Sequence, residues 1–200
     1  MSEQLILVRH GETLHNVAGI AQGWADSELS DRGKEQVRRL GERLRRHKCD
    51  ALFASPLGRA LTTATAIRDV LGLEITVLED LREMSYGDWE SRSFLDVRRD
   101  DAATYERWIA DPEAPSPNGE SHADVRRRME RAFAAVSEAK RPLLVTHGTA
   151  IRIGATALLD MPALAAHRFA QENAAINVFF WRVDRWVLRT WNDTSHCPER

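Results

Sequence analysis

Short apolar runs of strand length alternate with segments of helical periodicity along almost the whole chain. Strands that alternate with helices favour a mostly parallel sheet that is covered by helices on both faces. A short polar turn separates the last two runs, which indicates a terminal hairpin. The runs are LILVR (5–9), ALFAS (51–55), EITVL (74–78), PLLVTH (142–147), INVFFW (176–181) and RWVLRTW (185–191).

Four segments between these runs carry helix signals. Between residues 30 and 47 the apolar positions fall on one face, as in an amphipathic helix. The Ala-rich segment after Pro56 ends on Gly72, which suits a C-cap. Ser121 and Asp124 form a capping-box pattern before a third helix. A fourth helix is expected from Gly148 to just before Pro162, and a loop over residues 111–121.

Composition limits the classes of partner. A formal net charge of −2 gives no overall basic field for nucleic acid or anionic lipid, so any anion must bind to a local cluster. Cys49 and Cys197 match no metal-binding or redox spacing. The first residues have no basic leader, and no apolar run is long enough to span a bilayer. We therefore expect one cytoplasmic domain over residues 1–200.

Chemically capable residues follow four of the predicted strands. In an open α/β sheet, ligands bind beyond the carboxyl ends of the strands, so these residues are expected to converge. They are Arg9 and His10, Ser55 with Arg59, Glu83, and His147 with Gly148.

These residue types together suit a phosphomonoester. Paired guanidinium donors match two phosphate oxygens, so Arg9 and Arg59 are the expected clamps. His10 is the better placed nucleophile if its other ring nitrogen is held by a hydrogen bond. His147, at a helix start, is expected to donate to the oxygens that gain charge, together with backbone amides. Glu83 is the candidate acid for the leaving group and the base for water.

Each residue also has an ordinary structural interpretation. A histidine at a strand end is more often a satisfied polar group, and Arg59 alone reads as a solvated helix residue. Glu83 competes with several acidic neighbours that are equally good surface charges. A metal site built from His10, Glu12, His15 and His147 is disfavoured, because the adjacent Arg9 would repel a cation and no HExxH motif or cysteine cluster is present.

An ordered set of motifs resembles the histidine phosphatase superfamily, also called phosphoglycerate mutase-like, over nearly the whole chain. LVRHGETLHN is similar to the signature with the phosphoryl-accepting histidine, here His10, followed by Asn16. In the segment 21–36, Gln22 and Gly23 would approach the bound phosphate. SPLGRALTTA, LREMSYGDWE and VTHG resemble the motifs of the second arginine, the acid and the second histidine. The resemblance implies that Arg9, His10, Arg59, Glu83 and His147 are the catalytic set.

The resemblance further implies a Rossmann-like three-layer α/β/α sandwich with a mostly parallel central sheet. It implies metal-independent catalysis through phosphohistidine without a cofactor, and a small phosphorylated metabolite as substrate. Two departures stand out: Ser91 replaces a common glycine, and the interval 91–115 is short and of mixed charge. Arg98 and Arg99 in it read either as substitutes for mutase arginines or as a solvated helix face.

Three functions stay open at this stage. The short interval favours a phosphatase, because a mutase needs a closed lid that excludes water. A cofactor-dependent phosphoglycerate mutase is the alternative, and a non-catalytic binding module is the third. Phe94, Tyr105, Trp108 and His122 are candidates to face the leaving group, although aromatic residues at helical spacing are usually core. A homodimer through the edge of the terminal hairpin is a further possibility.

Overall fold

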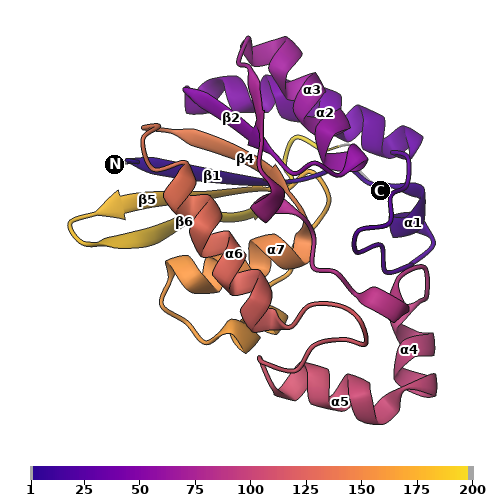
Figure 1. Ribbon diagram of the computed structural model, residues 1–200. Coiled ribbons are helices and arrows are strands. Elements are labelled where there is room, and N and C mark those ends of the chain that lie inside the picture. Colours follow the sequence, from indigo (N-terminus) through magenta and orange to yellow (C-terminus); the bar gives the residue numbers. More distant parts are fainter. Residues whose placement is uncertain (1, 198–200) are drawn as a thin grey trace.

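The computed structural model describes residues 2–197 and has a six-stranded sheet at its centre (Figure 1). The strand order is β3-β2-β4-β1-β5-β6. The four strands from β3 to β1 are parallel, whereas β5 runs antiparallel to both β1 and β6. The predicted parallel sheet with a terminal hairpin is therefore confirmed. The strands are β1 (Gln4–Arg9), β2 (Ala51–Ala54), β3 (Ile75–Val77), β4 (Pro142–Thr146), β5 (Ile176–Arg182) and β6 (Arg185–Asp193).

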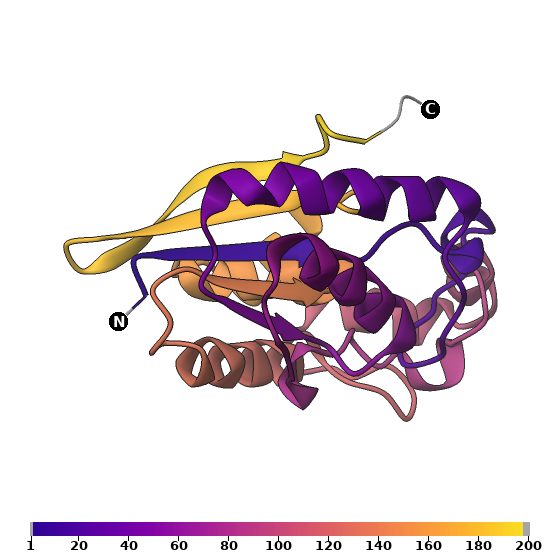
Figure 2. The ribbon, with the colours of Figure 1, turned by 90° about the horizontal axis from the view of Figure 1, so that it is seen from above.

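Helices cover both faces of the sheet, so the fold is the expected three-layer sandwich. α2 (Asp31–Leu44) and α3 (Gly58–Leu71) lie side by side on one face (Figure 2). α6 (His122–Ala135) and α7 (Gly148–Leu158) cover the other. β1 contributes alternate residues to the two cores, as the period of two requires. No helix among residues 2–197 is long and apolar enough to cross a membrane.

The predicted helix ends are present. The Ser30 side chain accepts a hydrogen bond from the Gly33 amide at the start of α2. Gly72 ends α3 in the left-handed conformation with φ +69°. Ser121 and Asp124 form the reciprocal capping box of α6. These local signals fix where the helices begin relative to the strands before them.

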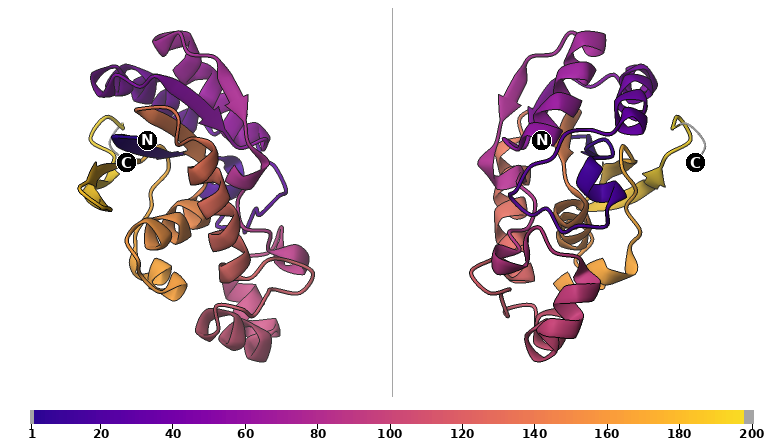
Figure 3. Two further views of the ribbon diagram at one scale, coloured as in Figure 1. Left: turned by 60° about the vertical axis from the view of Figure 1, so that its left-hand side comes forward. Right: turned by 90° about the vertical axis from the view of Figure 1, so that its right-hand side faces the viewer.

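The interval 91–115 folds into two short helices that the sequence did not separate. α4 (Phe94–Asp100) and α5 (Ala102–Ala110) project away from the sheet on the side of α6 and α7 (Figure 3). Arg98 and Arg99 are exposed, which agrees with the solvated-face interpretation. Ser91 adopts φ +65°, a backbone conformation that favours glycine, so the chain keeps the turn without that residue. The other short helices are α1 (Leu14–Val17), η1 (Arg45–His47), η2 (Glu79–Leu81), η3 (Gly87–Trp89) and η4 (Ala163–Arg168).

The loop after β1 lies directly against the first turn of α2. A Cβ on Gly33 would sit 2.0 Å from the carbonyl oxygen of Glu12, and one on Gly11 would sit 2.6 Å from Val37. The Gly11 amide donates to the Thr63 hydroxyl of α3 at 3.1 Å. Two helices thus hold the segment that immediately follows the first strand.

We predict that Gly33→Ala lowers the free energy of unfolding by about 1–3 kcal/mol, because the new methyl group meets main-chain atoms that cannot rotate away. Urea unfolding followed by circular dichroism measures this change. Lys34→Ala, on the exposed face of the same turn, is the matched control and should change stability by less than about 0.5 kcal/mol. Equal effects of the two substitutions would contradict the close approach.

Candidate active site

The strand register brings three predicted residues to one level at the edge of the sheet. Arg9 pairs with Thr146 across β1 and β4, so the following residues, His10 and His147, are neighbours. Their ring centroids are 5.1 Å apart. β2 ends level with the same strand, which places Ser55 beside His147. The expected convergence at the carboxyl ends of the parallel strands is present.

One hydrogen bond determines the tautomer of His10. Its Nδ1 lies 2.8 Å from the carbonyl oxygen of Gly11, which can only accept, so Nδ1 carries the proton. Nε2 therefore has a free lone pair. Burial, together with the charges of Arg59 and Arg9, holds the pKa of His10 well below its usual range. The ring is thus a neutral imidazole with one nucleophilic nitrogen.

Ser55 orients the second histidine in the same way. Its hydroxyl accepts from the Leu57 amide at 3.3 Å and lies 2.8 Å from His147 Nε2. We infer that the hydroxyl hydrogen points to Nε2, so that Nδ1 of His147 is protonated. Nδ1 is buried and has no hydrogen-bond partner among residues 2–197. The ring therefore presents an unused donor next to His10.

Main-chain carbonyls fix the two arginines, of which Arg59 is buried and Arg9 is half-buried. Arg59, 2% exposed, donates to Gly23 O at 2.7 Å and to Ala25 O at 2.9 Å. Arg9 donates to the carbonyl of Gln171. Nε of each guanidinium is buried without a partner in the described part of the chain. These bonds preset the direction of both cations, as an anion site requires.

Glu83 caps the helix that begins after His147. Its carboxylate accepts from the amides of Thr149 at 3.1 Å, Ala150 at 3.0 Å and Met84 at 2.9 Å. The sequence suggested that the start of α7 would donate to phosphate oxygens; two of its amides instead donate to Glu83. Glu83 therefore differs from its acidic neighbours in two ways: it caps a helix, and it lines the cavity that contains His10.

An ion pair between a buried arginine and a half-buried glutamate braces the segment that carries Glu83. Arg128 of α6 binds Glu120 through two parallel hydrogen bonds of 2.9 and 3.0 Å. The same guanidinium donates to the carbonyls of Asp80 and Arg82, just before the acid. Glu120 also accepts from the Ser85 amide at 2.8 Å. The sequence gave no signal for this pair, because its members belong to different motifs.

His10, the two arginines and Glu83 line one cavity of about 210 Å³, which we call the phosphate pocket. His147 lies fully buried beside the pocket rather than in its wall. Gln171 was missed from the sequence; it lines the pocket, and its amide atoms are buried without partners in the described chain. The predicted residues that line the pocket are Arg9, His10, Asn16, Gln22, Gly23, Arg59, Glu83 and Gly148.

Asn16, Gln22 and Gly23 also have clear structural roles. Asn16 caps α1 and accepts from Asn173 at 2.9 Å, and Gln22 accepts from the Thr13 hydroxyl at 3.1 Å. Gly23 has φ +54°, and a Cβ there would lie 2.1 Å from Glu90. These three positions therefore shape the wall of the phosphate pocket.

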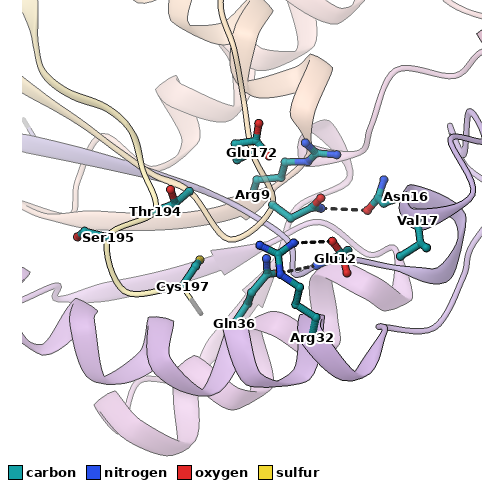
Figure 4. A pocket seen from close by; sticks show the side chains of 11 residues that line it. Arg9, Glu12, Asn16, Val17, Arg32, Gln36, Glu172, Thr194, Ser195 and Cys197 are labelled. Carbon is teal, nitrogen blue, oxygen red and sulfur yellow. Dashed lines mark hydrogen bonds and ion pairs between the residues drawn. The ribbon is translucent and has the colours of Figure 1, made fainter. Parts of the chain in front are cut away.

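A larger hollow of about 1000 Å³, whose lining is drawn in Figure 4, shares Arg9 and Asn16 with the phosphate pocket. Its polar groups bond largely to one another. Arg32 pairs with Glu12 at 2.8 Å, and Gln36 accepts from the Glu12 amide. Its size therefore does not make it the reactive centre, since the two histidines and Glu83 lie in the smaller pocket.

A third cavity adjoins the phosphate pocket, and all four predicted leaving-group residues line it. These are Phe94, Tyr105, Trp108 and His122. Trp108 is also part of the core, which confirms the packing interpretation of that residue, and its contact with a leaving group stays a prediction. In the described part of the chain, no group of three or more His, Cys, Asp or Glu side chains is placed to hold a metal ion.

Comparison with known proteins identifies the family. Residues 5–194 match the model of the histidine phosphatase superfamily, branch 1, and the chain belongs to this superfamily. It is 34% identical to a protein of Erwinia tasmaniensis named as a probable phosphoglycerate mutase GpmB, over 98% of this chain and 95% of that protein.

Several solved structures that resemble the chain are phosphatases. The α-ribazole phosphatase of Shigella flexneri is 32% identical, with a TM-score of 0.85 over 96% of both chains. A phosphoserine phosphatase of Entamoeba histolytica, solved with 3-phosphoglyceric acid, is 29% identical with a TM-score of 0.89 over 99% of this chain and 100% of its own. A mycobacterial glucosyl-3-phosphoglycerate phosphatase is 29% identical with a TM-score of 0.88, over 96% of this chain and 99% of its own. The named substrates differ, so the family alone does not define the alcohol.

We predict that both histidines of the site carry their proton on Nδ1 at neutral pH. Long-range ¹⁵N–¹H correlation spectra of labelled imidazoles measure the tautomer directly. Ser55→Ala removes the donor to His147 Nε2, so only that ring should change its tautomer distribution. His10, held by Gly11, is the internal control; a change of both rings, or of neither, would contradict the assigned roles.

We predict a second, pH-dependent effect at His122. Burial, with His167 and Arg152 adding to it, lowers the pKa of His122 from 6.5 to about 4. Between pH 6.5 and pH 4, His122 is therefore protonated in the unfolded chain but not in the folded one. The stability that is present above pH 6.5 is lost as the pH falls toward 4. This one group should lower the free energy of unfolding by about 2 kcal/mol between pH 7.5 and pH 5.

Urea unfolding of wild type and His122→Asn at both pH values separates this contribution from other titrations. The asparagine variant should lose less stability on acidification than wild type does. Parallel losses in the two proteins would show that His122 does not carry the effect.

Proposed function

We propose that the protein is a metal-independent phosphomonoesterase that acts on small phosphorylated metabolites through a phosphohistidine at His10. The observation that carries the proposal is the neutral His10 ring, which has a free Nε2 and lines one cavity together with Arg9 and Arg59. An uncharged nitrogen beside cations is what attack on a phosphate dianion requires. The phosphatase names of similar structures support the same reaction class.

In the first step, His10 Nε2 attacks phosphorus and forms an N–P bond while the P–O bond to the alcohol breaks. Arg9 and Arg59 bind the non-bridging oxygens, and His147 Nδ1–H donates to an oxygen that gains charge. Glu83, protonated at this stage, gives its proton to the departing alkoxide.

In the second step, the Glu83 carboxylate takes a proton from water, and the resulting hydroxide attacks phosphorus. The N–P bond breaks, its electron pair returns to Nε2, and inorganic phosphate is formed. Because α7 amides hold Glu83 in one position, the same carboxyl can serve both steps.

The positions of Arg98 and Arg99 favour water over an acidic alcohol as the acceptor. The exposed Arg99 pairs with Asp96 and Asp100, and neither it nor Arg98 lines a cavity beside His10. A mutase must hold a carboxylate and exclude water, and these arginines are not placed for that task.

A cofactor-dependent phosphoglycerate mutase is the second candidate. The mutase name of similar proteins favours it, and Arg152 lies where the two cavities meet. With 3-phosphoglycerate and a bisphosphate primer, this candidate yields 2-phosphoglycerate, whereas the phosphatase yields phosphate. The third possibility, a non-catalytic module, predicts no turnover of either kind.

We predict that His10→Ala lowers the turnover of p-nitrophenyl phosphate, measured with chelator present, by at least about 10³-fold. Wild type quenched in base should carry one phosphoryl group on His10. His47→Ala, which removes a half-buried histidine bonded to Gln4 far from the pocket, is the control and should keep its activity.

Turnover that persists in His10→Ala would refute the assignment of the nucleophile. Turnover that chelator abolishes in wild type would refute metal independence. Loss of activity in His47→Ala as well would indicate a folding defect rather than a catalytic role.

A further inference from the structure

The cavity next to the phosphate pocket is walled mainly by rings, and we call it the aromatic cavity. Its volume is about 220 Å³. It shares Tyr86, Phe94, Thr149 and Arg152 with the phosphate pocket, so the two spaces adjoin. The alcohol part of a phosphomonoester bound at His10 would therefore lie next to the aromatic cavity.

The rings of the aromatic cavity present flat faces and edges to one another. Trp108 lies nearly parallel to Phe94, at 14°, with centroids 6.2 Å apart. His122 lies 4.8 Å from Trp108 and 4.8 Å from His167, which it meets edge-on. Such surfaces bind another ring by offset stacking and edge-to-face contact, which a flexible chain cannot reproduce.

Buried polar atoms in this wall lack partners. Both ring nitrogens of His122, a residue 1% exposed, have no hydrogen-bond partner among residues 2–197, nor has Trp108 Nε1. Buried polar groups are nearly always paired in folded proteins, and each unpaired one costs free energy. Because the aromatic cavity adjoins the phosphate pocket, a bound ring that carries hydrogen-bonding atoms would supply these partners.

Charge in the aromatic cavity limits the ligand further. Arg152 donates to the Thr149 hydroxyl at 2.8 Å, so its cation stays at the junction with the phosphate pocket. Among residues 2–197, no carboxylate lines the aromatic cavity. Arg152 would repel a cationic group. Apart from Arg152, the lining consists of aromatic, aliphatic and hydroxyl side chains and two histidines, which suit an uncharged ring.

We propose that the alcohol part of the substrate carries a flat, uncharged aromatic ring that binds in the aromatic cavity. This inference rests on the proposed phosphatase function and specifies its substrate class. A three-carbon acid such as glycerate would leave the ring walls uncovered. Because the two cavities are adjacent, only a short linker is needed between the ring and the phosphate ester.

Phosphonates that cannot be hydrolysed test this proposal by binding alone. Calorimetric titration of the whole protein with benzyl-, 2-phenylethyl- and 3-phenylpropylphosphonate varies the linker. Propylphosphonate lacks the ring, and cyclohexyl analogues replace it with a puckered one. At least one phenyl ligand should bind about tenfold or more tighter than propylphosphonate, and several-fold tighter than its cyclohexyl analogue.

A filling substitution locates the preference. Ala166 lines the aromatic cavity, and Ala166→Leu places extra methyl groups in it. In this variant, the ratio of the affinity for the phenyl ligand to the affinity for propylphosphonate should fall at least about fivefold. Propylphosphonate itself should bind as tightly as it does to wild type. Ala163→Leu, in the same 3-10 helix but outside that lining, is the matched control and should keep the phenyl preference.

The outcomes distinguish failure of the aromatic-ring inference from failure of the proposed phosphatase function. Equal binding of phenyl and propyl ligands by wild type overturns the aromatic-ring inference. So does a phenyl preference that Ala166→Leu leaves unchanged. Turnover of propyl phosphate and benzyl phosphate in the same preparation tests the phosphatase separately, so hydrolysis without a ring preference would refute only the inference. A ring preference without hydrolysis of either ester would refute only the phosphatase.

Discussion

The register of three parallel strands is the constraint on which the site depends. β4 lies between β1 and β2, and the three strands end at one level. A slip by one residue would turn every side chain to the opposite face and separate His10 from His147. The cores on both faces of the sheet oppose such a slip, because each strand buries residues on both sides. Stability of the sheet and alignment of the reactive groups are therefore the same requirement.

Main-chain groups, more than side chains, fix the direction of the reactive residues. Gly11 O sets His10, Gly23 O sets Arg59, and α7 amides set Glu83. Such partners come with the fold and need no further residue. A site held in this way pays little reorganisation when charge develops, which is the basis of electrostatic preorganisation.

Local signals explain why much of this could be predicted. Apolar runs gave the strands, caps such as Ser121 gave helix starts, and the strand-end rule brought His10 and His147 to one edge. The aromatic cavity was only partly accessible, because Arg152 and His167 carry no local pattern and reach it through tertiary packing. The bonds from Glu83 to the amides of α7 link segments far apart in the chain. Ser91 shows a different limit: a non-glycine residue can hold a left-handed turn when its surroundings fix it.

The position of α4 and α5 away from the sheet has an evolutionary consequence (Figure 1). These helices supply much of the wall of the aromatic cavity. The groups of the phosphate pocket instead come largely from the edge of the sheet and the loops that follow its strands. Under the proposed function, substitutions between Phe94 and Ala110 would therefore alter which alcohol is accepted while leaving His10 and Arg59 in place. Proteins of this fold can therefore diverge in substrate specificity by changing this one surface segment. Exchange of residues 94–110 between relatives offers a route to new substrates.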